Sequence, residues 1–281
     1  MNQSDISQSV AYPGPPGSHA SVAAGVLFPR ETLLPFGGFH AVADAVATAA
    51  VGHGVLPIES SLAGSVAETH DLLYERALSI VGETILPVTH CLGALGAPQL
   101  GAIRAVHSHP SAFDQCRSLL ALLPKARTVP AATTSEAARR VAEAGDRTHA
   151  AIASAEALRL FGLDVVVADA GDSPAFTRFV SIAAFTRVGP EENARTALTF
   201  ATDHRPGALF HAIEPFARAG LDLVRLVSRP LPATPWRYRF DAVVAGHPLD
   251  PTVRLALREL AERTASLRVV GIYQGHPEEA A

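Results

Sequence analysis

Short apolar runs alternate with alanine-rich stretches through the first two thirds of the chain, and this alternation limits the fold more than any other feature. Residues 10–12 form an apolar run that meets a loop rich in proline and glycine, and a helical stretch begins at Ser18. Residues 39–58 repeat this order, with Gly52 and Gly54 placed to end a helix before the next apolar run. The pattern predicts α/β units with parallel strands, whose ligands usually bind beyond the carboxyl ends of the strands.

Further units of the same kind follow, and the pattern changes after a break at residues 186–193. Beyond the break the expected order is strand, helix, strand, strand, helix, strand, which is typical of a small split α/β unit with an antiparallel sheet. We therefore predict a second domain there. The remaining strands are expected at 84–95, 105–108, 150–153, 165–168, 196–201, 223–228, 238–244 and 268–272, and the helices at 112–122, 135–143, 155–161, 207–218 and 251–263.

Charge and composition narrow the class of partner. The chain has 281 residues, of which 48% are hydrophobic, so it can bury the cores of two or three compact units. Its formal net charge of -4 gives no general attraction to nucleic acid or to an anionic membrane, so a small anionic ligand needs a local site. Lysine occurs once, at Lys125, which argues against a lysine Schiff base and leaves the cationic chemistry to arginine.

Cysteine use and hydropathy indicate the compartment. Cys91 and Cys116 are too few for a disulfide framework or a cysteine zinc site, and we expect two reduced, buried side chains. The N-terminal segment lacks a basic region followed by an apolar stretch, and no run reaches the ~18 apolar residues of a membrane span. We therefore expect a cytoplasmic protein without a membrane partner.

Polar residues gather at five points where a strand should end or a helix should begin. Serine and threonine at such points are first of all helix caps, and capping alone explains any one cluster. Ser18 is the clearest expected cap, and the free N–H groups of the helix that it starts suit a carboxylate or phosphate. Five clusters together favour a shared cleft, and they lie at 14–21, 57–65, 108–116, 132–138 and 175–179.

The side chains in these clusters limit the chemistry of the cleft. They offer hydroxyls, backbone N–H groups and one arginine, with no evident nucleophile–base pair and no glycine-lysine phosphate loop, which suits a small polyanionic organic acid. His107 and His109 alternate along a strand and should face opposite ways, so no metal site is predicted. Glu59 and Glu68 have the chemistry of an acid or base, although solvated or capping roles explain them as well.

Several of these motifs, in their order and spacing, resemble the prephenate dehydratase family, and two later motifs resemble its C-terminal regulatory ACT domain. The resemblance covers residues 10–273, and the motifs are specific as a set although each is weak alone. The catalytic motifs are "AYPGPPGSHAS", "GVLPIESSLAGSVAETHDLL", "VHSHPSAFDQC", "TTSEAA" and "SPAFTRF", and the ACT motifs are "PGALF" and "LVSRP".

The resemblance implies the architecture. It implies an α/β catalytic region of two lobes, similar to periplasmic binding proteins, followed by a βαββαβ ACT domain of ferredoxin-like fold. Prephenate would bind between the lobes, phenylalanine would bind the ACT domain at a subunit interface, and the chain would form a homodimer or homotetramer. The implied boundaries are 8–186 for the catalytic region, with lobe one at about 8–82 and 160–186 and lobe two at about 83–159, and 194–275 for the ACT domain.

The resemblance also implies an activity, the decarboxylating dehydration of prephenate to phenylpyruvate in phenylalanine biosynthesis, by a carbon–oxygen lyase that needs no cofactor and no metal. The family's key threonine falls on Thr177, whose hydroxyl would assist the departing hydroxide. Arg178 follows it, and a supporting salt bridge is the preferred role because tight binding of the departing carboxylate would raise the barrier. The expected substrate-binding residues are Ser18, Ser60, Ser61, Gly64, Ser65, His109, Thr133, Thr134, Arg178 and Phe179.

Three positions depart from the family pattern. The usual asparagine after Glu59 is Ser60, and the asparagine usually two positions before the threonine is Ala175, so the cleft loses amide contacts worth about 1 to 3 kcal/mol each. In the ACT motif the usual glutamate is Val227, so weaker phenylalanine control is expected. The expected effector residues are Gly207, Ala208, Leu209, Val227, Ser228 and Arg229, whereas Trp236 and Tyr238 are expected in the core or at an interface.

These departures leave two alternatives to the dehydratase. The first is a prephenate decarboxylase, which resembles dehydratases but keeps the ring hydroxyl and forms a non-aromatic product. The second is a catalytically inactive amino-acid sensor that retains the cleft and the ACT domain. The retained Thr177 favours dehydration.

Overall fold

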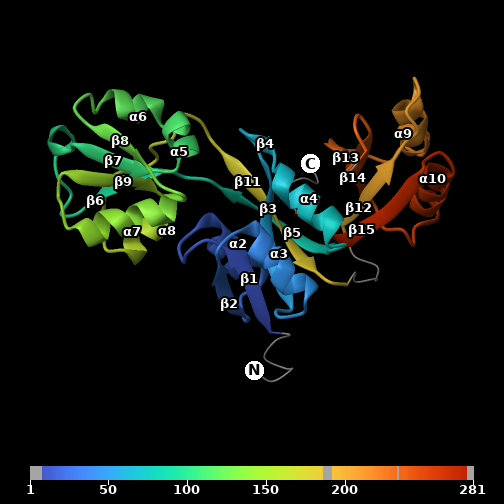
Figure 1. Ribbon diagram of the computed structural model, residues 1–281, viewed down its shortest axis with the longest axis horizontal. Coiled ribbons are helices and arrows are strands. Elements are labelled where there is room, and N and C mark those ends of the chain that lie inside the picture. Colours follow the sequence, from blue (N-terminus) through green and yellow to red (C-terminus); the bar gives the residue numbers. More distant parts are fainter. Residues whose placement is uncertain (1–7, 186–191, 233, 277–281) are drawn as a thin grey trace.

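The computed structural model describes residues 8–185, 192–232 and 234–276, and these residues form two sheets (Figure 1). The strand order of the long sheet is β13-β14-β12-β15-β5-β11-β3-β1-β2, with β4 paired to β3. The strand order of the second sheet is β10-β6-β9-β7-β8. The chain is therefore a mixed α/β protein with two catalytic-region lobes and a C-terminal unit, as the sequence predicts.

Lobe one holds the N-terminal part of the long sheet. The strands β1, β2 and β3 are parallel, and β11 runs antiparallel between β3 and β5. Helix α2 packs on one face of this sheet through alanine side chains, and α3 and α4 cover the other face. The elements are β1 (Ser9–Pro13), α2 (His19–Leu27), β2 (Thr32–Phe36), α3 (Phe39–Ala47), β3 (His53–Ser60), β4 (Gly64–Ser65), α4 (Ala67–Glu75), β5 (Ser79–Pro87) and β11 (Phe176–Ala183).

Lobe two is built on the second sheet, with α5 and α6 packed on one face and α7 and α8 on the other. Its two connections to lobe one run side by side, because Val88 N–H donates to Ala175 O and Ala170 N–H donates to His90 O. The elements are β6 (Cys91–Ala94), η1 (Leu100–Ala102), β7 (Ala105–Ser108), α5 (Pro110–Gln115), α6 (Arg117–Ala121), β8 (Arg127–Pro130), α7 (Thr134–Ala144), β9 (His149–Ala153), α8 (Ala155–Leu160) and β10 (Asp164–Val167).

The C-terminal unit has the predicted order βαββαβ and an antiparallel sheet. Helices α9 and α10 cover one face of this sheet, and α4 of lobe one packs on the other (Figure 1). Its last strand joins lobe one at Gly271, which pairs with Ile80 of β5. The elements are β12 (Ala194–Ala201), α9 (Ala208–Arg218), β13 (Leu223–Pro230), β14 (Tyr238–Ala245), α10 (Pro251–Glu262) and β15 (Ser266–Gln274).

The boundaries within the catalytic region differ from the prediction. The expected strand 84–95 is two strands in two different sheets, because β5 ends at Pro87 and the chain crosses between lobes before β6. Since β10 belongs to the second sheet, lobe two extends over 91–167 rather than 83–159. The expected helix 112–122 is broken at Cys116, whose φ of -127° is not helical.

Candidate active site

Thr177 lies at the start of β11, opposite Ser60 at the end of β3. Its side chain is partly buried. The strand alternation puts it on the α2 face of the sheet, because Phe179 two residues later packs in the core beneath α2. The sequence therefore brings the expected catalytic hydroxyl to the carboxyl end of β3, where α/β proteins usually bind ligands.

The loop after β3 is tied to the strand that carries Thr177. Ser61 N–H donates to Phe176 O, and Phe176 N–H donates to the Ser61 hydroxyl at 2.9 Å. The Ser60 hydroxyl accepts from the N–H groups of Leu62 and Ala63, both at 3.3 Å. Gly64 pairs with Ser60 at a φ of +76°, a conformation that favours glycine. Ser65 pairs with Glu59 in the same short hairpin.

The loop before α2 contacts the helices of lobe two. Ser18 is the N-cap of α2, as predicted, and its hydroxyl accepts from Ser21 N–H. Ser135 in the first turn of α7 donates to Pro16 O at 3.0 Å, and Ser154 at the start of α8 donates to Gly17 O at 3.3 Å. The amino ends of α2, α7 and α8 therefore meet between the lobes, and their positive dipole ends favour a bound anion.

The remaining expected cleft residues belong to lobe two. Thr133 is the N-cap of α7, with Glu136 N–H donating to its hydroxyl, and Thr134 begins the helix. His109 follows β7 and is the N-cap of α5. Its Nδ1 accepts from Ser111 N–H at 3.2 Å and lies 2.7 Å from the Ser111 hydroxyl. No local pattern in the sequence marks this serine–histidine contact.

Arg178 points away from the hydroxyl of Thr177 and is held by carboxylates. Its Nε lies 3.3 Å from Glu59 Oε2, and its Nη1 lies 3.2 Å from Glu83 Oε2. Glu83 is buried on β5, whereas Glu59 is half-buried and also lies 3.6 Å from Arg225 of the C-terminal unit. These ion pairs are the contacts expected of a supporting role, and the part that Arg178 plays in substrate binding stays a prediction.

Phe179 packs against α2 beneath the candidate site. Its ring is 2% exposed and packs with Tyr12 and with the alanines of α2, so it belongs to the core beneath the site. Phe179 lies within the part of β11 that α2 covers, and its expected contact with the substrate stays a prediction.

Two histidines near the lobe connection were not predicted as site residues. Burial lowers the pKa of His19, the first residue of α2, to about 4, and His90 nearby acts in the same direction. Burial also lowers the pKa of His90, whose Nε2 lies 3.0 Å from Gln115 Oε1. Within the described residues His19 Nε2 and His90 Nδ1 are buried without a hydrogen-bond partner. Both rings are therefore neutral near pH 7.

The expected effector residues form two separate groups in the C-terminal unit. Gly207, Ala208 and Leu209 begin α9 and line a groove of about 240 Å³ together with Tyr238 and other residues of that end of the sheet. Arg229 instead faces α4 and forms an ion pair with Asp71. Val227 and Ser228 precede it on β13. Of the expected effector residues, only Gly207, Ala208 and Leu209 line this groove among the described residues.

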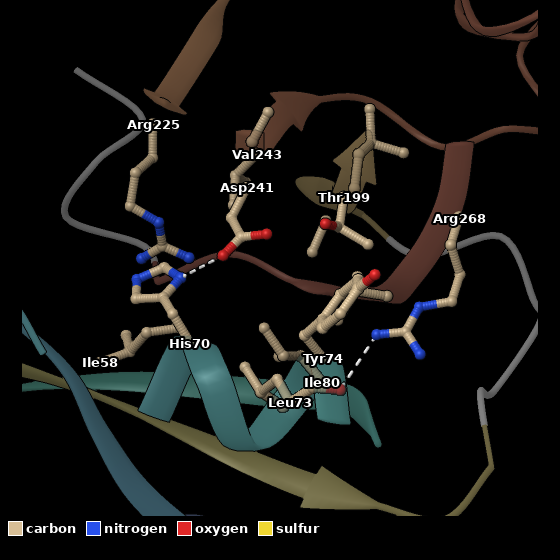
Figure 2. Close-up of a pocket in the computed structure, with 14 residues that line it drawn as sticks. Ile58, His70, Leu73, Tyr74, Ile80, Thr199, Arg225, Asp241, Val243 and Arg268 are labelled. Atoms are coloured by element: carbon tan, nitrogen blue, oxygen red, sulfur yellow. Dashed lines mark hydrogen bonds and ion pairs between the residues drawn. The ribbon is translucent and has the colours of Figure 1, made fainter. Parts of the chain in front are cut away.

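A second set of polar contacts joins α4 to the C-terminal sheet (Figure 2). His70 Nδ1 lies 3.0 Å from Asp241 Oδ2, and the guanidinium of Arg239 lies 4.4 Å from the ring centre of Tyr74. Arg268 donates to Leu73 O at 3.0 Å. The cavity there has a volume of only about 20 Å³, which is enough for a single water molecule. This region is therefore a packing interface between α4 and the C-terminal sheet and is too small to be a substrate site.

Clusters of metal ligands and membrane-spanning helices are both absent from the described residues. No group of three or more His, Cys, Asp or Glu side chains is arranged there to hold a metal ion. None of the helices in the same part of the chain is long and apolar enough to cross a bilayer. Cys91 and Cys116 are free and buried, as expected.

Comparison with known proteins identifies the family. The family model for prephenate dehydratase matches residues 10–186, which is more than half of the chain. The bifunctional chorismate mutase/prephenate dehydratase of Escherichia coli (strain K12) is 34% identical over 273 residues, covering 95% of this chain and 71% of that protein. The chain belongs to the prephenate dehydratase family.

Solved structures of similar proteins agree with this membership of the prephenate dehydratase family. A prephenate dehydratase from Arthrobacter aurescens, in complex with L-Phe, has a TM-score of 0.87 and 28% identity, covering 95% of this chain and 90% of that one. GqqA, described as a novel type of quorum quenching acylase, has a TM-score of 0.88 and 32% identity, covering 97% of this chain and 99% of that one. Both likenesses include the C-terminal unit.

Proposed function

We propose that this protein is a prephenate dehydratase, a carbon–oxygen lyase that forms phenylpyruvate, carbon dioxide and water from prephenate in phenylalanine biosynthesis. The observation that carries the proposal is the pairing of Thr177 with Ser60 at the carboxyl end of β3, on the α2 face, in a chain of this family. The catalytic region proposed for this reaction is 8–186, and the ACT-like regulatory domain is 194–275.

Substrate binding would rely on the amino ends of helices rather than on cationic side chains. Prephenate carries two carboxylates, and the first turns of α2 and α7 supply N–H groups and hydroxyls near which a carboxylate is stabilised. Arg178 is engaged by Glu59 and Glu83, and His19 is neutral, so neither would fix the departing carboxylate. That arrangement avoids stabilising the ground state at the expense of the transition state.

The chemical step would need one placed hydroxyl. As the bond to the ring carboxylate breaks, its electrons enter the ring and expel the ring hydroxyl from the opposite carbon, so that carbon dioxide leaves and the ring becomes aromatic. The Thr177 hydroxyl would donate a hydrogen bond or a proton to the departing hydroxide. The proton that converts this hydroxide to water comes from solvent, either directly or by reprotonating Thr177. The proposal assigns no step to a metal or an organic cofactor.

Product identification tests the proposal. Purified protein incubated with prephenate should form phenylpyruvate, detected by its ultraviolet absorbance, and Thr177→Ala should lose this activity while it keeps the wild-type melting temperature. Thr177→Ser, which keeps the hydroxyl, is the matched control and should retain part of the activity. A non-aromatic decarboxylated product would instead support a decarboxylase, and unchanged prephenate would support the sensor.

The GqqA likeness and one contact favour a second candidate function, that of an acylase. The Ser111 hydroxyl lies 2.7 Å from His109 Nδ1, which is the contact that an acyl-transfer nucleophile makes with its base. The same contact also caps α5, since Ser111 N–H donates to the same nitrogen. Release of the amine from an acyl amide tests this candidate. An activity lost in Ser111→Ala and kept in Thr177→Ala would support it.

The C-terminal unit is the proposed site of effector binding and of subunit assembly. We propose an amino-acid effector of the phenylalanine type, weakened by Val227, and a homodimer or homotetramer that encloses it. Support comes from the exposed aromatic side chains of Phe210 and Tyr238 beside the groove at Gly207, and from Trp236, which is 81% exposed and therefore not a core residue. Light scattering with and without phenylalanine measures the number of subunits in the assembly. Inhibition of the enzyme at a low phenylalanine concentration would contradict the proposal that Val227 weakens phenylalanine control.

Two free, buried cysteines fit a reducing compartment, and we propose the cytoplasm. Localisation of a tagged full-length chain tests this proposal.

A further inference from the structure

Glu59 connects the candidate active site to the C-terminal domain. One carboxylate oxygen, Oε2, lies 3.3 Å from Arg178 Nε and 3.6 Å from Arg225 Nη1. The side chains of Arg178 and Arg225 are 13% and 9% exposed and that of Glu59 is 35% exposed, so this contact is partly shielded from water. A shielded ion pair is screened less than a surface pair, and the loss of one partner has a larger effect.

A local irregularity in β3 explains why Glu59 reaches this position. Arg178 pairs with Glu59, but the next residue on β11, Phe179, pairs with Pro57, so Ile58 is an extra residue on β3. Such a bulge changes the alternation of side chains. Leu56 and Ile58 both pack in the core on the α4 side, and the bulge turns Glu59 to this side as well, toward the C-terminal domain.

The contact lies one residue away from the proposed catalytic pair. Glu59 directly precedes Ser60, and Arg178 directly follows Thr177, so these four residues form two adjacent rungs of one strand ladder. A shift of Glu59 along the ladder would move Ser60 and the turn that its hydroxyl holds. Small displacements of a catalytic group lower the reaction rate strongly, because the reacting groups must stay aligned.

The C-terminal domain also holds the other carboxylate that binds Arg178. His276 N–H, just beyond β15, donates to Glu83 Oε1 at 3.0 Å. On β13, Arg229 forms an ion pair with Asp71 of α4, the helix that follows the hairpin at Glu59. The strand that carries Arg225 is therefore fixed to lobe one at two points, on either side of Val227 and Ser228.

We propose that Arg225, a residue of the C-terminal domain, is a positioning residue of the active site and acts through Glu59. It holds the Glu59 carboxylate, which together with Arg178 keeps Ser60 and Thr177 in register. This inference rests on the proposed dehydratase function. It makes β13 part of the catalytic apparatus, so a ligand that displaces this strand would change turnover in the cleft.

A double-mutant cycle tests the inference in the full-length chain. Arg225→Gln should lower kcat/KM for prephenate by about tenfold, chiefly through kcat, because the group acts on alignment rather than on binding. In the Glu59→Gln background the same substitution should change kcat/KM by less than about twofold, because its partner is already absent. Arg225→Lys, which keeps the charge, should recover part of the loss.

The matched control is Arg258→Gln, which removes an exposed arginine from α10 of the same domain and should behave as the wild type. If Arg225→Gln retains wild-type kcat/KM, or lowers it equally in both backgrounds, the inference is wrong. If Arg225→Gln fails to fold, Arg225→Lys is placed in the cycle instead, with the same criterion for coupling.

Hydrogen exchange separates this inference from the proposed function. Amides of residues 59–66 should exchange faster in Arg225→Gln than in the wild type or in Arg258→Gln, whatever reaction the protein catalyses. Unchanged exchange would overturn the inference. A wild-type protein that leaves prephenate unchanged would overturn the proposed function alone.

Discussion

Acidification should destabilise the folded protein through His19, a partly buried histidine between the lobes. The folded-state pKa of this side chain is about 4, because burial and the neighbouring His90 disfavour its charged form, whereas a histidine in the unfolded chain titrates near 6.5. Between these values the unfolded state binds more protons than the folded state. The stabilising contribution is therefore complete above pH 6.5 and is lost as the pH falls toward 4.

The size of the effect follows from the difference between the two pKa values. A difference of about 2.5 units corresponds to about 3 kcal/mol over the whole range, of which about 2 kcal/mol is lost by pH 5. Denaturant unfolding of the wild type and of His19→Gln at pH 7.5 and pH 5 isolates this contribution, because the other titrating groups cancel in the comparison. The free energy of unfolding should fall by about 2 kcal/mol less in His19→Gln than in the wild type.

His204, which is exposed in the loop after β12, provides the matched control, and His204→Gln should follow the wild-type curve. Equal losses of stability in the wild type and in His19→Gln would refute the assignment of a partly buried, neutral ring to His19.

Two further substitutions test how the C-terminal domain is attached. Gly271→Ala should lower the free energy of unfolding by about 2 kcal/mol or more, because a Cβ there would lie 2.2 Å from the carbonyl oxygen of Ile80. The control, Gly101→Ala at an exposed position, should change this free energy little. Equal stability of the two variants would contradict the pairing of β15 with β5. Asp71→Asn should lower the free energy of unfolding by about 2 kcal/mol, because it removes the charge that pairs with Arg229 and with the buried Arg239. Chemical denaturation measures this change, and an unchanged denaturation midpoint would show that these ion pairs contribute no stability.

The regular parts of the fold follow from local patterns in the sequence. The order of the C-terminal elements is correct because each amphipathic helix and alternating strand buries its apolar face within its own unit. The prediction of an N-cap at Ser18 is confirmed because this contact is also local: the Ser18 hydroxyl accepts from an N–H group only three residues away.

The errors arise where distant segments decide the structure. Nothing local marks residues 88–90 as a crossing between two sheets, so the apolar run around them reads as one strand. Phe179 belongs to the motif that carries Thr177, but the packing of α2 over β11 buries its ring. The contact between Glu59 and Arg225 joins residues 166 positions apart and depends on a bulge at Ile58, so no sequence pattern predicts it.

The central claim is that the Thr177 hydroxyl assists the departure of the ring hydroxyl from prephenate. Prephenate binding by calorimetry, combined with phenylpyruvate formation in the same preparations of wild type, Thr177→Ser and Thr177→Ala, tests it most directly. We predict that all three bind prephenate with similar affinity and that Thr177→Ala alone forms no phenylpyruvate. Turnover by Thr177→Ala at the wild-type rate would contradict the account.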